Sequence, residues 1–200
     1  MSATAGVGKR ERTKAANREA ILAAARRVFS DIGYGAASVR DIVRETDLAT
    51  GTFYNYFPDK ESVLRALVDE ITDEARARVR AARMAAATLE GFVSGGFRAY
   101  FEFLVEDPET VALMRRNSGT IRTMFGEPAL GAGIEELRAD LETAVTAGRI
   151  PPHDADLMAV AMVGAGVEMG LHMVEREPPD VERAVAFVTD VFLGAFERVG

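Results

Sequence analysis

The sequence contains no cysteine and only two histidines, and these scarcities exclude several kinds of site. Without cysteine there is neither a disulfide framework nor a thiolate metal site. The histidines, His153 and His172, are too few and too isolated for an ordinary zinc site. No phosphate-binding loop and no combination of nucleophile, histidine and carboxylate can be identified. We therefore expect no metal ion, no cofactor and no enzymatic activity.

Strand-like alternation, internal repeats and low-complexity tracts are also missing. Apolar residues recur at helical spacing between Pro and Gly punctuation, which predicts an all-α chain of about nine helices. The 200 residues, 48% of them hydrophobic, suffice for a small domain joined to a larger one. We expect a disordered basic arm at 1–13, a three-helix domain at 14–60 and a helical domain at 61–200, linked by a helix over 60–82. The N-terminus has no apolar signal region, so we expect a cytoplasmic protein.

The most specific pattern lies at residues 38–60, which read SVRDIVRETDLATGTFYNYFPDK. Ser38 followed by Asp41 three residues later forms a capping box that opens a short helix. In a second helix, after a tight turn, Phe53 and Phe57 lie four apart and can point inward together. The remaining side chains of that helix, mostly hydrogen-bonding, must then face outward. A short polar helix at the end of a helix-turn-helix is shaped to enter the major groove of DNA.

Residues 14–67 resemble the N-terminal domain of the tetracycline-repressor (TetR/AcrR) family of bacterial transcription regulators. They contain AILAAARRVFSDIGYGAASVRDIV and TGTFYNYFPDKESVL in the family's order and spacing. The rest of the chain matches only in helical layout and length. The resemblance implies an N-terminal three-helix helix-turn-helix DNA-binding domain, followed by a C-terminal helical domain for ligand binding and dimerisation.

The resemblance also implies which residues contact DNA. The positions that meet base edges in the family are here Thr50, Gly51 and Thr52, and a bare glycine backbone and a threonine hydroxyl suit that role. The positions at or beside phosphate contacts are Tyr54, Asn55, Lys60, Ser38 and Arg40, and Tyr56 fits either group. Phosphate contacts position a protein without reading the sequence.

Two residues depart from the family pattern. Ala49 stands where a serine or threonine usually caps the recognition helix, which costs about 1 kcal/mol. Thr50 occupies a position that is often lysine, so a potential phosphate or guanine contact is missing.

The net charge of −7 conceals an uneven distribution. Residues 1–60 carry ten Lys and Arg against seven Asp and Glu, a net +3, and the remaining residues carry −10. Phosphate contacts depend on local charge, not on the charge of the whole chain. The basic arm is either a solvated tail or a segment that follows the DNA backbone or enters the minor groove, and its position beside the helix-turn-helix favours contact with DNA.

The last two helices, expected over 154–175 and 180–198, carry the next strongest signal. Residues 157–174, LMAVAMVGAGVEMGLHMV, are apolar around nearly the whole circumference, and such a helix is buried on all sides. Their length approaches that of a membrane span, but Glu168 interrupts the run, so we expect no membrane partner. Two such helices from each of two subunits would form a four-helix interface, as the resemblance also implies. The residues expected at this homodimer interface are Gly164, Val167, Leu171, Val185, Val188 and Phe192.

By resemblance and by composition, the C-terminal domain should contain a ligand cavity. Aromatic residues and flexible methionines suit an adaptable apolar pocket, although they are also common in ordinary cores. The residues expected to line the pocket are Phe97, Tyr100, Phe101, Leu104, Met114, Arg122, Phe125, Met162, Met169 and His172. The pair Gly95–Gly96 indicates either close helix packing or clearance for a ligand. Glu168 and His172 lie four apart and could orient an effector, but an internal pair is favoured.

Together these patterns predict a ligand-responsive transcription regulator that acts as a homodimer. It would be a repressor of a pseudo-palindromic double-stranded DNA operator, released by a small apolar or amphipathic effector. One alternative is an effector-binding protein whose head no longer recognises a specific site, which Ala49 and the acidic C-terminal domain would favour. An enzyme is the other alternative, and no motif supports it.

Overall fold

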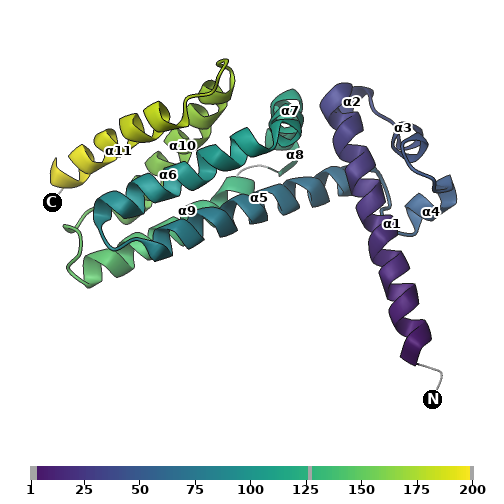
Figure 1. Cartoon of the computed structure of the whole chain (residues 1–200), viewed down its shortest axis with the longest axis horizontal. Helices are drawn as coiled ribbons and strands as arrows, with labels where there is room; N and C mark the ends of the chain where they lie inside the picture. The colour runs from purple at the N-terminus through teal and green to yellow at the C-terminus, as the bar shows by residue number, and fades with distance from the viewer. Residues whose placement is uncertain (1–3, 126–127, 199–200) are drawn as a thin grey trace. The chain divides into compact units, whose positions relative to one another are not determined.

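The computed structural model describes residues 4–125 and 128–198, and each regular element in these ranges is an α-helix, which confirms the all-α prediction. In chain order the helices are α1 (Thr4–Asp31), α2 (Gly33–Ala36), α3 (Val39–Arg44), α4 (Thr50–Tyr54), α5 (Lys60–Ala85), α6 (Leu89–Glu106), α7 (Pro108–Arg116), α8 (Ser118–Phe125), α9 (Pro128–Thr146), α10 (Ala155–Val174) and α11 (Val181–Arg198) (Figure 1). These described helices exceed the nine expected because α2 is an additional short helix and because Asn117 divides the helix expected over 109–124 into α7 and α8.

The helices group into two compact units. The head unit comprises Met1–Glu70 and Glu109–Phe125, and the C-terminal unit comprises Ile71–Pro108 and Gly126–Gly200. Helices α7 and α8 therefore belong with α1–α4, although the sequence analysis places them in the domain over 61–200. The long helix α5 runs from the first unit into the second.

Helix α1 begins at Thr4, so the expectation of a disordered arm at 1–13 is wrong for residues 4–13. This stretch has no apolar face, which is why the sequence indicated disorder. Its second half nevertheless contains the run Lys9–Arg12, whose residues are all good helix formers. Arg12 Nε also donates a hydrogen bond to Gly8 O at 3.0 Å, one turn earlier.

The core of the head unit is made by apolar side chains at helical spacing on α1 and α5, into which the short helices insert. The buried members are Ile21, Leu22, Ala25, Phe29, Ile42, Phe53, Phe57, Val63, Leu64, Leu67 and Val68. Phe53 and Phe57 point inward as predicted, with ring centroids 6.1 Å apart. Asp59 accepts a hydrogen bond from Ser62 N at 2.8 Å and so caps the start of α5.

The core of the C-terminal unit lies between α6, α9, α10 and α11. Its largest buried side chains are Phe97, Phe101, Leu137, Leu141, Met158, Met162, Val185, Val188, Phe192 and Phe196. Helix α6 approaches α10 at two glycines. A Cβ at Gly170 would lie 2.6 Å from Leu104 Cδ1, and one at Gly166 would lie 3.2 Å from Phe97 Cε1. These two glycines therefore face the unit's own core.

Helix α10 is long and apolar enough, by length and composition, to cross a membrane, a property that core helices share. It packs against α6, α9 and α11, but within one chain it is not buried on all sides as predicted, since Leu157 and Val160 are exposed.

A buried ion pair joins α5 to α9 within the C-terminal unit. The side chain of Arg83 is 7% exposed and places Nη2 3.0 Å from Asp140 Oδ2. A Cβ at Gly96 would lie 3.4 Å from Arg83 Cγ, and one at Gly95 would lie 3.7 Å from Ala82 O. A Cβ at either position would make only ordinary van der Waals contacts with α5, so this packing does not by itself require glycine at Gly95 or Gly96. Burial lowers the pKa of the Arg83 guanidinium from its ordinary value, and the charge of Asp140 opposes this shift.

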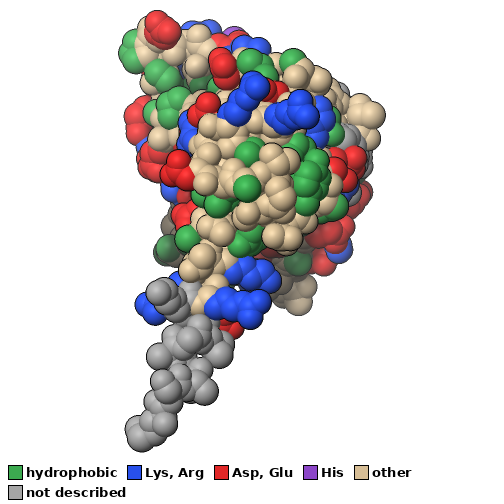
Figure 2. Space-filling view, turned by 90° about the vertical axis from the view of Figure 1, so that its right-hand side faces the viewer, with side chains coloured by type: hydrophobic (Ala, Val, Ile, Leu, Met, Phe, Trp, Pro, Cys, Tyr) green, Lys and Arg blue, Asp and Glu red, His purple; other side chains and the backbone are tan. Residues whose placement is uncertain are grey.

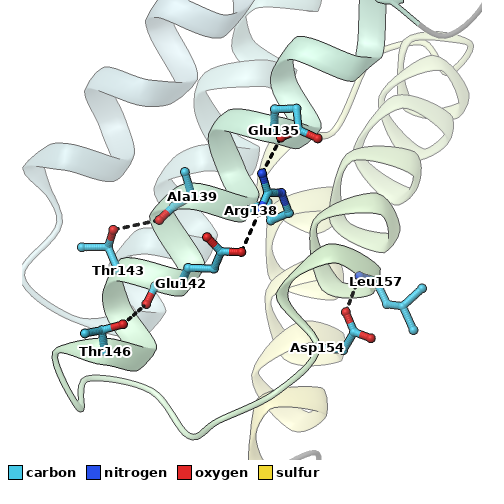
Figure 3. A network of polar contacts seen from close by, with 8 residues as sticks. All are labelled: Glu135, Arg138, Ala139, Glu142, Thr143, Thr146, Asp154 and Leu157. Atoms are coloured by element: carbon cyan, nitrogen blue, oxygen red, sulfur yellow. Dashed lines mark hydrogen bonds and ion pairs between the residues drawn. The ribbon is translucent and has the colours of Figure 1, made fainter.

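The exposed side of α9 is stabilised by local polar contacts (Figure 3). Arg138 lies between two carboxylates of its own helix, donating to Glu135 at 2.6 Å and to Glu142 at 2.7 Å. Such pairs stabilise an exposed helix by a few tenths of a kcal/mol, roughly 0.2–0.5 each. In the same view, Asp154 accepts a hydrogen bond from Leu157 N at 3.0 Å and caps α10.

Candidate nucleic-acid interface

Helix α3 begins with the predicted capping box. Ser38 N donates to Asp41 Oδ2 at 2.9 Å, and Asp41 N donates to Ser38 Oγ at 3.3 Å. The hydrogen bonds from the Ser38 hydroxyl and backbone lower the pKa of the Asp41 carboxyl from its ordinary value. The start of α3 is therefore fixed by a reciprocal pair, with a carboxylate where the helix dipole favours negative charge.

The turn between α3 and α4 is built from local hydrogen bonds. Thr46 Oγ1 donates to Val43 O at 2.8 Å and accepts from Leu48 N at 3.2 Å. Ala49, the residue before α4, makes no side-chain capping bond, as its lack of a polar group requires. Phe53, which is fully buried, anchors α4 to the core of the head unit.

The outward face of α4 carries the side chains that the resemblance assigns to DNA. Thr50, Gly51, Tyr54 and Asn55 are exposed, and Thr52 is half-buried. A Cβ at Gly51 would meet nothing within 4 Å, so the packing of the head unit does not require glycine there. Figure 2 shows the face that carries α3 and α4, with uncharged side chains at its centre and Lys and Arg on two sides of them.

Tyr56 is attached to α1 and borders a shallow depression. Asn17 Nδ2 donates to the Tyr56 hydroxyl at 3.2 Å. The depression, about 250 Å³ in volume, is lined by Glu11, Lys14, Ala15, Arg18 and Tyr56. Arg18 is also paired with Glu70 at 2.8 Å, so part of its charge is neutralised within the head unit.

Lys60, expected at a phosphate, also has partners inside the head unit. Its Nζ donates to Tyr34 O at 2.7 Å and to Ala37 O at 2.8 Å, and it lies 4.3 Å from the centroid of the Tyr34 ring. An ammonium group has three hydrogens, so one remains for a phosphate oxygen. Lys60 thus ties the start of α5 to the connection between α2 and α3, and its phosphate contact stays a prediction.

The structure does not gather the ten residues expected in the effector pocket. Phe97, Phe101, Leu104 and Met162 are buried in the C-terminal unit, and Tyr100 and Met169 are half-buried beside that core. Burial raises the pKa of the Tyr100 hydroxyl to about 12.

Of the remaining four, only Met114 and His172 have described side chains. Met114 belongs to the head unit, and the side chains of Arg122 and Phe125 lie outside the described residues. His172 is exposed, with its Nδ1 3.9 Å from Glu175 Oε2, so it does not line an apolar interior. Its neighbours are Glu175 and Arg176, not the Glu168 expected from helical spacing.

Half of the expected dimer interface is buried within a single chain. Val185, Val188 and Phe192 are 3%, 2% and 6% exposed, because they form the side of α11 that packs against the C-terminal unit's own core. They are therefore not available to a second subunit, and this part of the prediction is wrong. Gly164 is exposed, and Val167 and Leu171 are half-buried on α10.

Other large apolar side chains on the same two helices are exposed. Leu157 and Val160 of α10 are 65% and 47% exposed, and Phe187 and Val191 of α11 are 58% and 50% exposed. Helix α11 is apolar on two sides, so its spacing alone did not identify the side that faces outward. Phe187 is the sequence signal that could have done so, because it lies off the stripe of Val185, Val188 and Phe192.

Asn117, which is not among the residues predicted from the sequence, is 2% exposed and hydrogen-bonded to α1 and α2. Asparagine is unfavourable inside a helix and favourable at helix ends. Its presence within the expected helix over 109–124 was therefore a usable signal for the division between α7 and α8.

The comparisons with known proteins agree with this geometry. Residues 21–67 match the family described as bacterial regulatory proteins, tetR family. The HTH-type transcriptional regulator UidR of Escherichia coli is 27% identical over 143 residues, which are 64% of this chain and 73% of that protein. The HTH-type transcriptional repressor AcnR of Corynebacterium glutamicum is 36% identical over 93 residues, 46% of this chain and 43% of that protein.

Among solved structures, the transcriptional regulator FadR from Bacillus subtilis, in complex with stearoyl-CoA, has a TM-score of 0.73. It is 22% identical and covers 86% of this chain and 96% of its own, which is a likeness of fold.

A capped helix, a tight turn and an exposed polar helix on a small apolar core define a helix-turn-helix DNA-binding transcription regulator. The N-terminal part of the chain, over residues 21–67, matches the DNA-binding domain of the tetR family of bacterial regulatory proteins.

Proposed function

We propose that the protein is a homodimeric repressor that binds a pseudo-palindromic DNA operator and is released by a small apolar or amphipathic effector. The observation that carries this proposal is the outward face of α4. Thr50 and Gly51 are exposed, and open space surrounds the position of a Gly51 Cβ. A bare backbone between two threonines can approach base edges in a major groove closely.

Phosphate contacts would hold α4 in its groove. Tyr54 and Asn55 at the end of α4, with Ser38 and Arg40 at the start of α3, are exposed. Arg10, Arg12 and Lys14 lie on the first turns of α1, so their charges would contact phosphates from a helix and not from a disordered arm.

The exposed apolar side chains of α10 and α11 support dimerisation. Leu157, Val160, Phe187 and Val191 would be covered if these two helices met the same pair from a second subunit. The open position of Gly164 would let the partner helix approach. The two copies of α4 would then lie about 34–36 Å apart, or a multiple of it, in successive major grooves.

The effector is proposed from the composition of the C-terminal unit and from one structural neighbour. Phe97, Phe101, Met162 and Met169 offer aromatic rings and flexible thioethers. FadR from Bacillus subtilis holds stearoyl-CoA, an amphipathic thioester, in a similar fold. An effector that prefers a differently spaced dimer lowers DNA affinity by its differential affinity for the two states. We expect the protein to act in the cytoplasm and to catalyse no reaction.

Selection of duplexes from a random-sequence library by the purified protein tests the DNA-binding part of the proposal. We expect enrichment of two inverted half-sites, with affinity that falls steeply as salt increases. The alternative, a head that no longer recognises a specific site, predicts salt-sensitive binding without enrichment of any sequence.

Titration of the complex with stearoyl-CoA, followed by fluorescence anisotropy of a labelled operator, tests the effector class. Release of the duplex by stearoyl-CoA, but not by coenzyme A alone, would support an amphipathic effector. Equal release by both would show that the apolar chain is not recognised.

A further inference from the structure

Asn117 lies at the corner where α7 ends and α8 begins. Its backbone belongs to both helices, since its N–H donates to Leu113 O at 3.1 Å and its carbonyl accepts from Ile121 N at 2.8 Å. Its side chain is 2% exposed. A buried amide is costly unless its donors and acceptor are paired, and these are paired with groups of three helices.

The side chain of Asn117 joins the corner to the end of α1 and to α2. Nδ2 donates to Phe29 O at 3.0 Å and to Leu113 O at 2.7 Å, while Oδ1 accepts from Tyr34 N at 2.6 Å. A substitution here would leave buried backbone groups of α1 and α2 without partners.

Other contacts fasten the same segment to α1 and α2. Ser30 Oγ donates to Glu109 O at 3.2 Å, and Arg26 Nη1 donates to Thr110 Oγ1 at 2.9 Å. Gly33 has φ of +80°, and the position of its absent Cβ is 3.5 Å from the side chain of Arg116. A larger residue at Gly33 would be strained in this backbone conformation.

From Tyr34, hydrogen bonds continue to the start of the helix-turn-helix. Tyr34 N is bonded to Asn117, and Tyr34 O accepts from Lys60 Nζ, which also donates to Ala37 O. Ala37 precedes Ser38, the residue that caps α3. The path from the α7–α8 corner to α3 therefore consists of hydrogen bonds among half-buried or buried groups within one compact unit.

The covalent chain connects this corner to the C-terminal unit at both ends. Helix α6 precedes α7, and α9 follows α8. Helix α6 carries Phe97, Tyr100, Phe101 and Leu104, which pack in or beside the core of that unit. A single residue, Asp107, separates α6 from the segment that Asn117 holds.

We propose that Asn117 is a positioning residue that couples the α7–α8 segment to the orientation of α3 and α4. This inference rests on the proposed function, because it identifies the route by which an effector would lower DNA affinity. Displacement of the α7–α8 corner either breaks the bonds of Asn117 or carries α2, Lys60 and the start of α3 with it. The route is additional to α5, the linking helix expected from the sequence.

Substitution Asn117→Ala tests the coupling, with Leu141→Ala as the matched control. Leu141 is fully buried in the C-terminal unit, so its truncation lowers stability without touching the head unit. Both variants are compared well below their melting temperatures. Asn117→Ala should lower affinity for the selected duplex about tenfold, which corresponds to ~1.4 kcal/mol, while affinity for random duplex stays within about twofold. Leu141→Ala should leave both affinities unchanged. Wild-type affinity of Asn117→Ala for the selected duplex would overturn the proposal.

Hydrogen exchange of the wild-type protein decides the matter if Asn117→Ala does not fold. Binding of the selected duplex should slow exchange in residues 109–121 as well as in α3 and α4. Slower exchange in α3 and α4 alone would show that the segment is not coupled to DNA binding.

Failure of the proposed function would be recognised separately, by the absence of any enriched duplex. In that case hydrogen exchange of the variants without DNA still tests the coupling between the α7–α8 segment and α3. Asn117→Ala, which removes the Oδ1 that accepts from Tyr34 N, should speed exchange over residues 34–44 relative to Leu141→Ala. Unchanged exchange over residues 34–44 would overturn the proposed coupling.

Discussion

At the scale of the residue, the face of α4 combines two kinds of DNA contact. Thr52 is half-buried, and the family resemblance assigns it to base edges. Tyr54 is 54% exposed, and the resemblance assigns it to a phosphate. The ring of Tyr54 packs edge-on against Phe53 with centroids 5.4 Å apart. Its hydroxyl can therefore be removed without removing the ring contact.

We predict that Thr52→Ala weakens binding to the selected operator about tenfold and leaves random duplex nearly unchanged, because base contacts carry ~1–3 kcal/mol of discrimination. Tyr54→Phe should weaken both duplexes by the same factor, since a phosphate contact is independent of sequence. Competition binding at one fixed salt concentration distinguishes the two. Equal losses on both duplexes for Thr52→Ala would contradict the division.

Tyr100 gives a pH dependence that can be isolated by one substitution. Its pKa is about 12 in the folded protein and near its ordinary value of 10.0 when unfolded. The folded state therefore holds the proton more tightly, so this contribution to stability is complete below pH 10 and is lost as pH rises toward 12. The two-unit difference corresponds to an upper limit of about 2.7 kcal/mol.

Urea unfolding at several pH values checks this expectation. Between pH 10 and 12, the wild-type protein should lose more stability than Tyr100→Phe, and below pH 9 the difference between them should be constant. Parallel curves for the two proteins over the whole range would show that Tyr100 does not titrate as described.

At the scale of the element, the sequence predicted helix boundaries best where a cap or an aromatic pair fixed them. Ser38 and Asp41 set the start of α3, and Phe53 sets the inward side of α4, which ends at Tyr54, before Phe57, which is also buried. The α7–α8 division and the outward side of α11 were missed, because both depend on tertiary partners. Asn117 is a sequence signal for a helix end, but its hydrogen-bond partners on α1 and α2 are visible only in the structure. Periodicity cannot choose between two apolar sides of one helix.

The N-terminal arm also shows a limit of prediction from apolar periodicity. Residues 4–13 have no apolar side, so the sequence indicates disorder where the structure has helix. The effector residues were predicted from composition, which is common to cores and pockets. Four of them prove to be core side chains of one unit.

The pair of Arg83 and Asp140 joins α5 to α9, and its loss should be costly. Asp140→Ala leaves the Arg83 guanidinium buried without its carboxylate, which typically costs ~3–5 kcal/mol. Replacing both residues by apolar side chains of similar volume, Arg83→Met with Asp140→Leu, should restore most of that stability. Urea unfolding of the single and double variants measures this. A loss below about 1 kcal/mol for Asp140→Ala would mean that Arg83 reaches water or another partner.

At the scale of the whole molecule, the sequence predicted the fold class, while the two-helix dimer face stays a prediction, and three of the residues chosen for it are buried within one chain. Phe187 and Val191 are the apolar side chains that a second subunit can reach. The basic head and acidic remainder give the chain a net charge of −7, which by itself would indicate poor DNA binding. Local charge on the head, not the total, decides contact with phosphate.

Phe187→Glu should convert the dimer to monomer, because it would bury a charge in an apolar interface. The control is Met84→Glu, a substitution at a side chain that is 70% exposed on α5. Sedimentation velocity should show monomer for the first variant and dimer for the second. Dimer in both would mean that subunits associate through another face.

The most direct test is hydroxyl-radical footprinting of the wild-type protein on the duplex that it selects. Two copies of α4 related by a dyad should protect two half-sites whose centres lie about 10–10.5 base pairs apart, or a multiple of it. Phe187→Glu should abolish both protected regions together. A single protected half-site that persists in Phe187→Glu would contradict the account, since the protein would then bind its DNA as a monomer.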